Sequence, residues 1–235
     1  MDLFQDLRRN PYPGRGIVLG LSEGGRYAVI VYFIMGRSEN SRNRVFVEKD
    51  GGIATEAFDP AKITDPVLIL YSPVRVCANG VTVVTNGDQT DTIAEYLASG
   101  KTFEDALMTR SFEPDAPNYT PRISGMLKIC DARAQYKLSI QKTCDGDPDS
   151  PQFFCFSYPM PRAGEGHFLH TYMTDGDPLP SYSGEPKRVG ISGNIDDFSA
   201  ALWKNMDGAN KVSLFVRFFD LLSGETKTRI VNRHC

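Results

Sequence analysis

A short polar segment of the chain, GRSENSRNR at residues 36–44, gathers three guanidinium groups and two hydroxyls directly after a β-rich apolar run. These side chains are Arg37, Ser38, Ser41, Arg42 and Arg44. Guanidinium forks bind phosphate or carboxylate oxygens two bonds at a time, and hydroxyls donate to the oxygens that remain. The segment therefore predicts a site for a planar anion. The alternative is that these arginines lie on an exposed edge strand, where they only keep the surface soluble.

The segments before this cluster are predicted to present it at the mouth of a buried hairpin. Tyr12 to Gly16, with sequence YPGRG, is a rigid turn that carries one cation, Arg15. Residues 17–21 and 27–35 are β-rich and apolar, and Glu23-Gly24-Gly25 between them is typical of a hairpin turn.

Two further polar residues and one short segment can each be interpreted either as functional or as purely structural. Residues 86–91 follow a strand and begin a helix, where backbone N–H groups can bind an anion, although a plain helix cap has the same pattern. Glu113 lies in a proline-rich loop beside Asp115 and is a candidate general base, or else a solvated carboxylate. Tyr71 ends an apolar run and could donate to a developing oxyanion, or only close the strand.

Several other classes of site find no support in the sequence. His167 and His170 have no acid or thiol nearby to complete a metal set, so we expect no metal site. No phosphate-loop, dinucleotide-binding or nucleophile-elbow motif is present. The five cysteines are odd in number and widely spaced, which indicates free thiols in a reducing compartment.

Composition and charge favour a soluble cytoplasmic protein. The chain has 235 residues, 41% of them hydrophobic and 23% charged. Its 26 basic residues are outnumbered by 29 acidic ones, which argues against a nucleic-acid binder. The N-terminus has acids and no apolar core, unlike a secretory signal, and the apolar run at residues 28–35 is far too short to cross a bilayer.

The alternation of apolar runs and turn signals predicts a layered α+β fold, mostly of antiparallel strands, as one domain over residues 1–235. Strands are expected at 44–47, 53–58, 67–71, 74–77, 81–85, 123–129, 133–140, 153–158, 212–222 and 227–231. Helices are expected at 2–9, 88–100 and 103–109, and after Asn194 with Ile195, Phe198, Leu202 and Met206 on one face. Residues 144–190 are rich in Pro, Gly and Asp, so a loop-rich excursion around one or two short strands is expected there.

Five motifs in order, NPYPGRGIVLG, GRSENSRNR, YSPVR, NGDQTDTI and EPDAPNYTPRISG, resemble the archaeal-type IMP cyclohydrolase family, over about residues 10 to 125. The resemblance implies a four-layer αββα architecture like that of the N-terminal-nucleophile hydrolases. It also implies closure of 5-formamidoimidazole-4-carboxamide ribotide (FAICAR) to IMP with loss of water, without metal or cofactor. Asp2 follows the initiator methionine, so N-terminal nucleophile chemistry is not expected.

By the same resemblance, Arg42 and Tyr71 would face the formyl oxygen and Glu113 would transfer protons. Substrate-binding positions would be Tyr12, Arg15, Arg37, Ser38, Ser41, Asn86, Gly87, Asp88 and Asn118. The expected partners are a small ribonucleotide and further copies of the chain, with no nucleic acid and no membrane. Two alternatives stay open: another enzyme acting on a purine or imidazole ribotide, and a non-catalytic ribotide-binding module.

Overall fold

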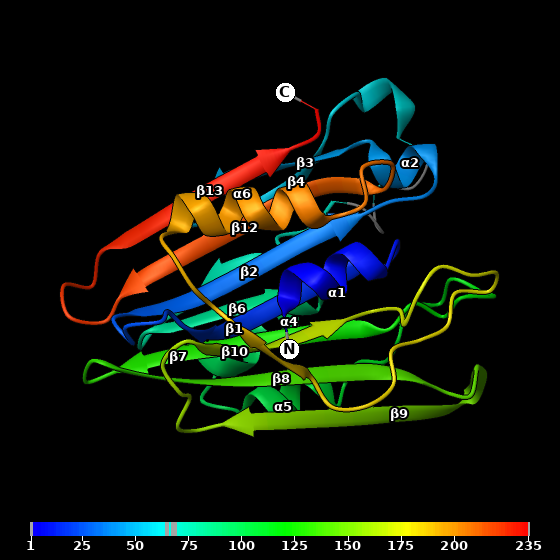
Figure 1. The fold of residues 1–235 in the computed structure, drawn as a ribbon. Helices are drawn as coiled ribbons and strands as arrows, with labels where there is room; N and C mark the ends of the chain where they lie inside the picture. Colours follow the sequence, from blue (N-terminus) through cyan, green and yellow to red (C-terminus); the bar gives the residue numbers. More distant parts are fainter. Residues whose placement is uncertain (1, 64–65, 67–69, 235) are drawn as a thin grey trace.

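The computed structural model describes residues 2–63, 66 and 70–234. Two antiparallel sheets make up most of it (Figure 1). The first sheet has the strand order β11 (Lys187–Gly190), β10 (Glu165–His170), β1 (Arg15–Leu21), β2 (Tyr27–Met35), β12 (Lys211–Asp220) and β13 (Thr226–Asn232). The second has the order β3 (Arg44–Lys49), β4 (Gly52–Ala57), β5 (Val74–Val76), β6 (Val81–Thr85), β7 (Arg122–Cys130), β8 (Arg133–Cys144) and β9 (Asp147–Tyr158). The prediction of an α+β fold of antiparallel strands is confirmed.

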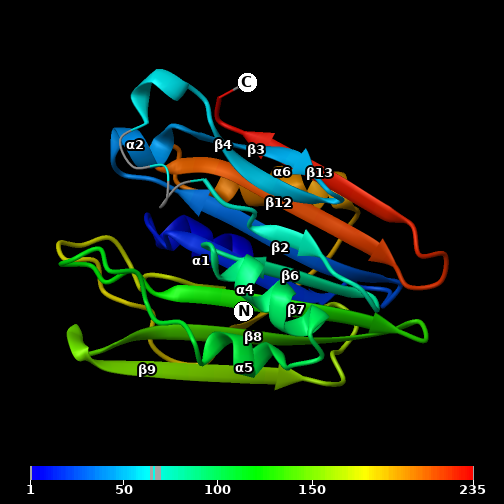
Figure 2. The same cartoon turned by 180° about the vertical axis from the view of Figure 1, so that it is seen from behind.

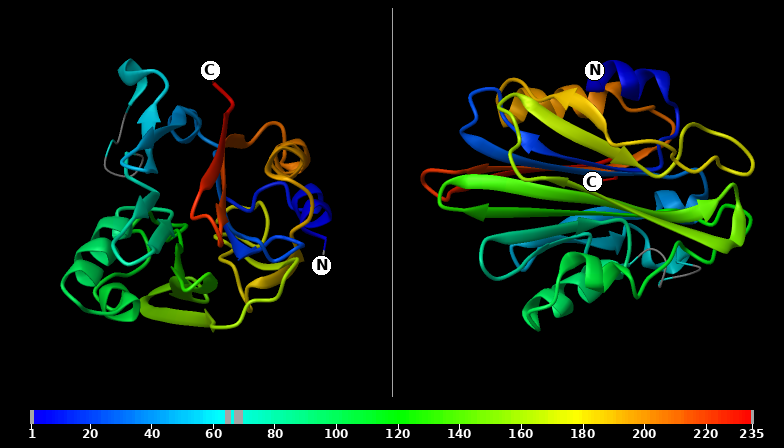
Figure 3. Two further views of the ribbon diagram at one scale, coloured as in Figure 1. Left: turned by 90° about the vertical axis from the view of Figure 1, so that its left-hand side faces the viewer. Right: turned by 90° about the horizontal axis from the view of Figure 1, so that it is seen from below.

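The two sheets pack face to face and helices cover their outer faces (Figures 1 and 2). Helices α1 (Leu3–Arg9) and α6 (Ile195–Asn205) lie on the first sheet. Helices α4 (Gln89–Ala98) and α5 (Phe103–Leu107) lie on the second, on the opposite side of the molecule (Figure 3). None of the helices in the described residues is long and apolar enough to cross a membrane.

Strand β1 shows why its sequence is apolar at consecutive positions. Ile17 and Leu19 enter the core between the sheets, whereas Val18 packs on the other face, beneath α1 and α6. A strand covered on both faces loses the alternation of apolar and polar residues. Residues on the same face as Ile17, at odd positions of β1, therefore point between the sheets.

Most of the predicted turns and caps are present. Asn79 and Gly80 have φ angles of 58° and 69°, as the predicted hairpin turn requires. Thr102 Oγ1 accepts from Asp105 N at 3.1 Å and begins α5, which ends two residues earlier than predicted. Asn194 accepts from two backbone N–H groups at the start of α6.

The expected loop-rich excursion over residues 144–190 is wrong for much of its length. Residues 147–158 form β9, a twelve-residue strand paired with β8, and β10 lies inside the first sheet beside β1. β9 tolerates Pro148 and Pro151 because it is an edge strand. Irregular structure remains mainly at residues 171–186. Of the strand predicted at 67–71, residues 67–69 lie outside the described residues.

Candidate active site

A polar pocket of about 280 Å³ opens at the end of the sandwich where α2 (Glu39–Arg42) lies (Figure 1). It is bounded by the turn before β1, by the segment after β2, by the loop before β7 and by the segment after β10. Its lining residues are Tyr12, Arg15, Arg37, Ser38, Asn40, Ser41, Glu113, Asp115, Asn118, Thr120, Tyr172 and Leu179. Seven of the predicted site residues, from three separate segments of the chain, therefore meet in one pocket.

Two arginines enter the space between the sheets beside this pocket. Arg15 begins β1 on the same face as Ile17, and Arg44 begins β3 on the same face as the core residue Phe46. Arg44 is fully buried and donates from Nε to Ser41 O at 2.9 Å. Its Nη1 and Nη2, and Nε of Arg15, are buried and have no hydrogen-bond partner within the described structure. Since buried cations are normally paired, these nitrogens mark a place for an acceptor from outside the chain.

Burial and neighbouring groups shift the pKa values of both arginines. Burial, with repulsion from Arg15, lowers the pKa of Arg44. Burial acts to lower the pKa of Arg15 as well, but the neighbouring groups of Tyr12, Tyr172 and Glu113 outweigh it and raise that pKa overall. Because guanidinium stays protonated in proteins, two cations lie close together: Arg15 lines the cavity, and Arg44 is buried behind its lining.

Tyr71 lies close to these arginines, although it does not line the pocket itself. It is 9% exposed, and its phenol oxygen lies 2.9 Å from that of Tyr32 in a hydrogen bond. Its electrostatic interaction with both Arg15 and Arg44 places the phenol near their guanidinium groups. Burial and Tyr71 together raise the pKa of Tyr32, so the Tyr32 phenol stays protonated at neutral pH.

Glu113 brings a carboxyl group to the same cavity. It is 7% exposed, and its N–H donates to Thr120 O at 2.9 Å, which closes the loop that carries it. Burial raises the pKa of Glu113, and the cations Arg15, Arg122 and Arg44 act against that rise. A carboxyl group with a raised pKa can accept and return a proton near neutral pH.

Two stacked tyrosines form one wall of the pocket. The rings of Tyr12 and Tyr172 are 5.9 Å apart, and the Arg37 guanidinium lies 5.2 Å from the Tyr12 ring centroid. Thr120 Oγ1 and Tyr172 Oη share a 2.6 Å hydrogen bond. The sequence prediction missed Tyr172, because it follows a strand in the region taken as loop. The apolar residues 168–169 just before it could have indicated that a strand ends near Tyr172.

The rim of the pocket holds most of the remaining predicted residues. Arg37 pairs with Asp175 at 2.7 Å. The hydroxyls of Ser38 and Ser41 cap α2 reciprocally, each accepting from the other's backbone N–H. Asn118 Oδ1 accepts from Leu179 N at 2.9 Å, which ties the loop before β7 to the segment after β10.

Three predicted site residues lie apart from the pocket. Arg42 donates to Gly36 O at 2.8 Å and to Asn210 at 3.2 Å, and lines a different surface hollow. The Asn86 side chain is engaged with the backbone of Pro121 and Ile123. Asp88 forms ion pairs with Arg110 and Arg122. Gly87 also does not line the pocket, although a Cβ there would lie 3.5 Å from Glu113 Oε1.

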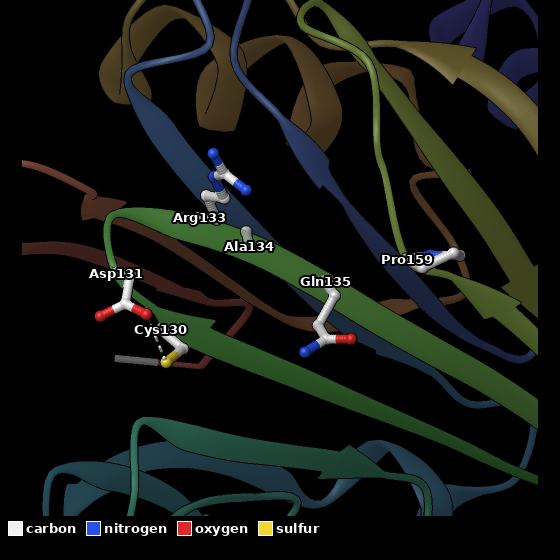
Figure 4. Close-up of a pocket in the computed structure, with 6 residues that line it drawn as sticks. All are labelled: Cys130, Asp131, Arg133, Ala134, Gln135 and Pro159. Atoms are coloured by element: carbon white, nitrogen blue, oxygen red, sulfur yellow. Dashed lines mark hydrogen bonds between the residues drawn. The ribbon is translucent and has the colours of Figure 1, made fainter.

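Another hollow, at the turn between β7 and β8, lacks side chains that converge on one point and is a weaker candidate for a site (Figure 4). Its side chains point in different directions, and the Cys130 thiol donates to the neighbouring Asp131 Oδ2 at 3.5 Å. β7 begins beside the Glu113 loop and ends at this turn, so the two hollows lie at opposite ends of the second sheet. Among the described residues, no group of three or more His, Cys, Asp or Glu side chains is placed to hold a metal ion.

Comparison with known proteins relates the chain to a single activity. Residues 12–224 match the family described as IMP cyclohydrolase-like protein. The IMP cyclohydrolase of Methanopyrus kandleri is 31% identical over 164 residues, which cover 68% of this chain and 75% of that protein. That of Haloarcula marismortui is 36% identical over 122 residues, 50% of this chain and 55% of the relative, so this match spans only about half of each. The chain belongs to the IMP cyclohydrolase-like family.

Proposed function

We propose that this protein is an IMP cyclohydrolase that closes FAICAR to IMP in the pocket between the two sheets. The family match and the relatives named IMP cyclohydrolase support the activity. The observation that supports the location is the pair Arg15 and Arg44, with buried guanidinium nitrogens that have no partner in the described structure and that face Glu113. Such a site suits a substrate with several oxygen acceptors.

Ring closure asks for three contributions from the protein. The carboxamide nitrogen must attack the formyl carbon, so the ribotide must be bound with these two atoms adjacent. The formyl oxygen gains negative charge and needs donors prepared to receive it. The nitrogen loses a proton, and the resulting hydroxyl must leave as water.

Glu113 is the proposed proton carrier. Its carboxylate takes one proton from the attacking carboxamide nitrogen and passes it to the formyl oxygen, which becomes a hydroxyl. When that hydroxyl leaves, the formamide nitrogen loses its proton as the ring C=N bond forms. Glu113 transfers this second proton to the departing hydroxyl, which completes the water, and the group ends each cycle as it began. The raised pKa of this buried carboxyl group favours both transfers.

Arg44 is the proposed donor to the formyl oxygen, together with Tyr71. This replaces the expectation for Arg42, whose guanidinium is bound to Gly36 and Asn210 outside the pocket. Nη1 and Nη2 of Arg44 are buried, and its Nε donates to the carbonyl of Ser41, a residue that lines the cavity. A donor that is fixed and dehydrated before the reaction stabilises a developing oxyanion more than a solvated one.

The remaining predicted residues are assigned to binding. Arg15, Arg37, Ser38 and Ser41 hold phosphate and ribose, Tyr12 gives an aromatic surface, and Asn118 contacts the base or sugar. Asn86 and Asp88 act as part of the frame instead, because their polar atoms are engaged within the protein.

We also propose that the two helix-covered sheets form one domain with the four-layer architecture of N-terminal-nucleophile hydrolases. The outer positions of α1, α6, α4 and α5 favour this. A cytoplasmic location and assembly into homo-oligomers remain predictions from the sequence.

The test is an assay of purified protein with FAICAR, in which purine ring formation is followed by ultraviolet absorbance, with and without a chelator. We expect turnover far above the protein-free rate, unaffected by the chelator and lost in Arg44→Ala. Binding of IMP without turnover would instead identify a ribotide-binding module. A protein that neither turns over FAICAR nor binds IMP would refute the proposal.

A further inference from the structure

Behind Glu113, the side chain of Arg122 is held by two acceptors. Its Nη1 donates to Asp88 Oδ1 at 2.7 Å and to Gln89 Oε1 at 2.6 Å. Asp88 occupies the N-cap position of α4 without forming a side-chain cap bond, and its second oxygen pairs with Arg110. An Asp at this position normally caps the helix, so its use here on two arginines is a departure from the usual role.

The backbone on both sides of Arg122 is fixed as well. Asn86 donates from Nδ2 to Pro121 O at 2.9 Å and accepts from Ile123 N at 2.8 Å. Gln89 Nε2 donates to Asn86 Oδ1 at 3.1 Å, and both of these side chains are buried. The turn between β6 and α4 therefore locks the start of β7, and Arg122 with it.

Gly87 lies between the Arg122 guanidinium and the Glu113 carboxylate. The point that a Cβ on Gly87 would occupy lies 2.5 Å from Arg122 Nη1 and 3.5 Å from Glu113 Oε1. The cation and the carboxylate oxygen are thus at most about 6 Å apart, a range in which opposite charges still favour ionisation.

Four charged groups act on Glu113: Arg15 from β1, Arg44 from β3, Arg122 from β7 and Asp115 from its own loop. Arg15 and Arg44 have unpartnered nitrogens that a substrate would engage. Once substrate oxygens neutralise these two cations, Arg15 and Arg44 stabilise the ionised form of Glu113 less. Arg122 has its partners within the protein, so its effect on Glu113, which already includes the pairing with Asp88, does not depend on whether substrate is bound.

We propose that Arg122 is a positioning residue: clamped by Asp88 and Gln89, it keeps the Glu113 carboxylate ionised while substrate occupies Arg15 and Arg44. This role rests on the proposed function of Glu113 as proton acceptor. Asn86, Gly87 and Asp88 then serve the reaction through Arg122 and not through contact with the ribotide.

The direct test needs no turnover. The protein is labelled with ¹³C at the glutamate carboxyl carbon, the Glu113 signal is assigned from its loss in Glu113→Gln, and the signal is titrated with pH. In Arg122→Gln the pKa of Glu113 should rise by about 1 unit. Arg122→Lys, which keeps the charge, should recover part of this shift. Arg110→Gln is the matched control, since Arg110 pairs with the same Asp88 but is not among the main charges that act on Glu113.

Kinetics then extend the test to the reaction. In Arg122→Gln the acidic limb of kcat/KM for FAICAR should move to higher pH by about the same unit, with activity restored above it. Gly87→Ala, whose methyl group would displace the Arg122 and Gln89 side chains, should shift the limb in the same direction. An unshifted Glu113 titration in folded Arg122→Gln, or a shift of equal size in Arg110→Gln, would overturn the proposal. Protein with a shifted titration but no turnover would retain this role for Arg122 and reject the proposed function.

Discussion

Arg42 and Arg44 are two residues apart, yet their guanidinium groups lie in different surroundings. Arg42 ends α2 and donates to Gly36 O and Asn210, on the side of a surface hollow. Arg44 begins β3, is fully buried, and leaves two nitrogens unpartnered within the described structure. The change from helix to strand between them makes this separation, and it decides which arginine can meet the substrate.

Replacing each of the two arginines should therefore give different results. Arg44→Ala should lower kcat/KM for FAICAR by about 10²–10³, because it removes a dehydrated donor to the developing oxyanion. Arg42→Ala should stay within about fivefold of the unaltered protein, since the contacts of this arginine outside the pocket contribute about 1 kcal/mol. Initial rates of purine absorbance under identical conditions measure both. An equal loss in the two variants would return the role to Arg42.

Arg44 should also oppose folding in the absence of ligand. Among the described residues no carboxylate pairs with its buried charge, and burial lowers its pKa, which means that folding disfavours the charged form. Arg44→Met fills a similar volume without that cost, so the free energy of unfolding should rise by about 1–3 kcal/mol. For a chain of this size, that corresponds to a Tm increase of about 2–10 °C.

Thermal unfolding in a phosphate-free buffer measures this change. A ribotide such as AICAR should then raise the Tm of the unaltered protein more than that of Arg44→Met. A lower Tm for the variant without ligand would show that the methionine disrupts the packing around Phe46, and would contradict the prediction.

The sequence was sufficient for the regular parts of the fold, because these depend on local patterns. The hairpin at Asn79–Gly80, the cap at Asn194 and the apolar β1–β2 pair are each encoded within a few residues. β9 was missed over residues 147–152 because proline and aspartate disfavour strands in general. Its long pairing with β8 overrides that preference, and such a contact is not visible in local sequence.

The site was predictable only in part, for a similar reason. Of the polar segment GRSENSRNR, Arg37, Ser38 and Ser41 line one pocket, whereas Arg42 lines another hollow. Which way each side chain points depends on strand register and on the partner sheet, so Arg42 and Arg44 could not be separated. Tyr172 reaches the pocket from a distant segment through its stack with Tyr12, which no spacing rule indicates.

Glu113→Gln should separate proton transfer from binding. The amide keeps the size of the side chain but cannot accept the proton from the attacking nitrogen, so kcat should fall by about 10²–10⁴. KM should change little, because binding is assigned to other groups. In the unaltered protein kcat/KM should decline as pH falls through the raised pKa of Glu113, since protonation removes the base. A variant with unchanged kcat would exclude Glu113 as the proton carrier.

Tyr172→Phe should test the wall that the sequence did not reveal. Phenylalanine keeps the stack on Tyr12 but loses the hydrogen bond to Thr120 Oγ1, a residue that also bonds Asp115 in the pocket. A lost buried hydrogen bond of about 1 kcal/mol predicts a fivefold lower kcat/KM, within roughly a factor of two. Tyr182→Phe is the matched control: Tyr182 is equally well buried, and its hydroxyl donates to Glu185 O outside the pocket. Steady-state kinetics with FAICAR should therefore show a loss in the first variant and none in the second, with similar small decreases of Tm in both. If both variants lost activity equally, Tyr172 would contribute only to stability.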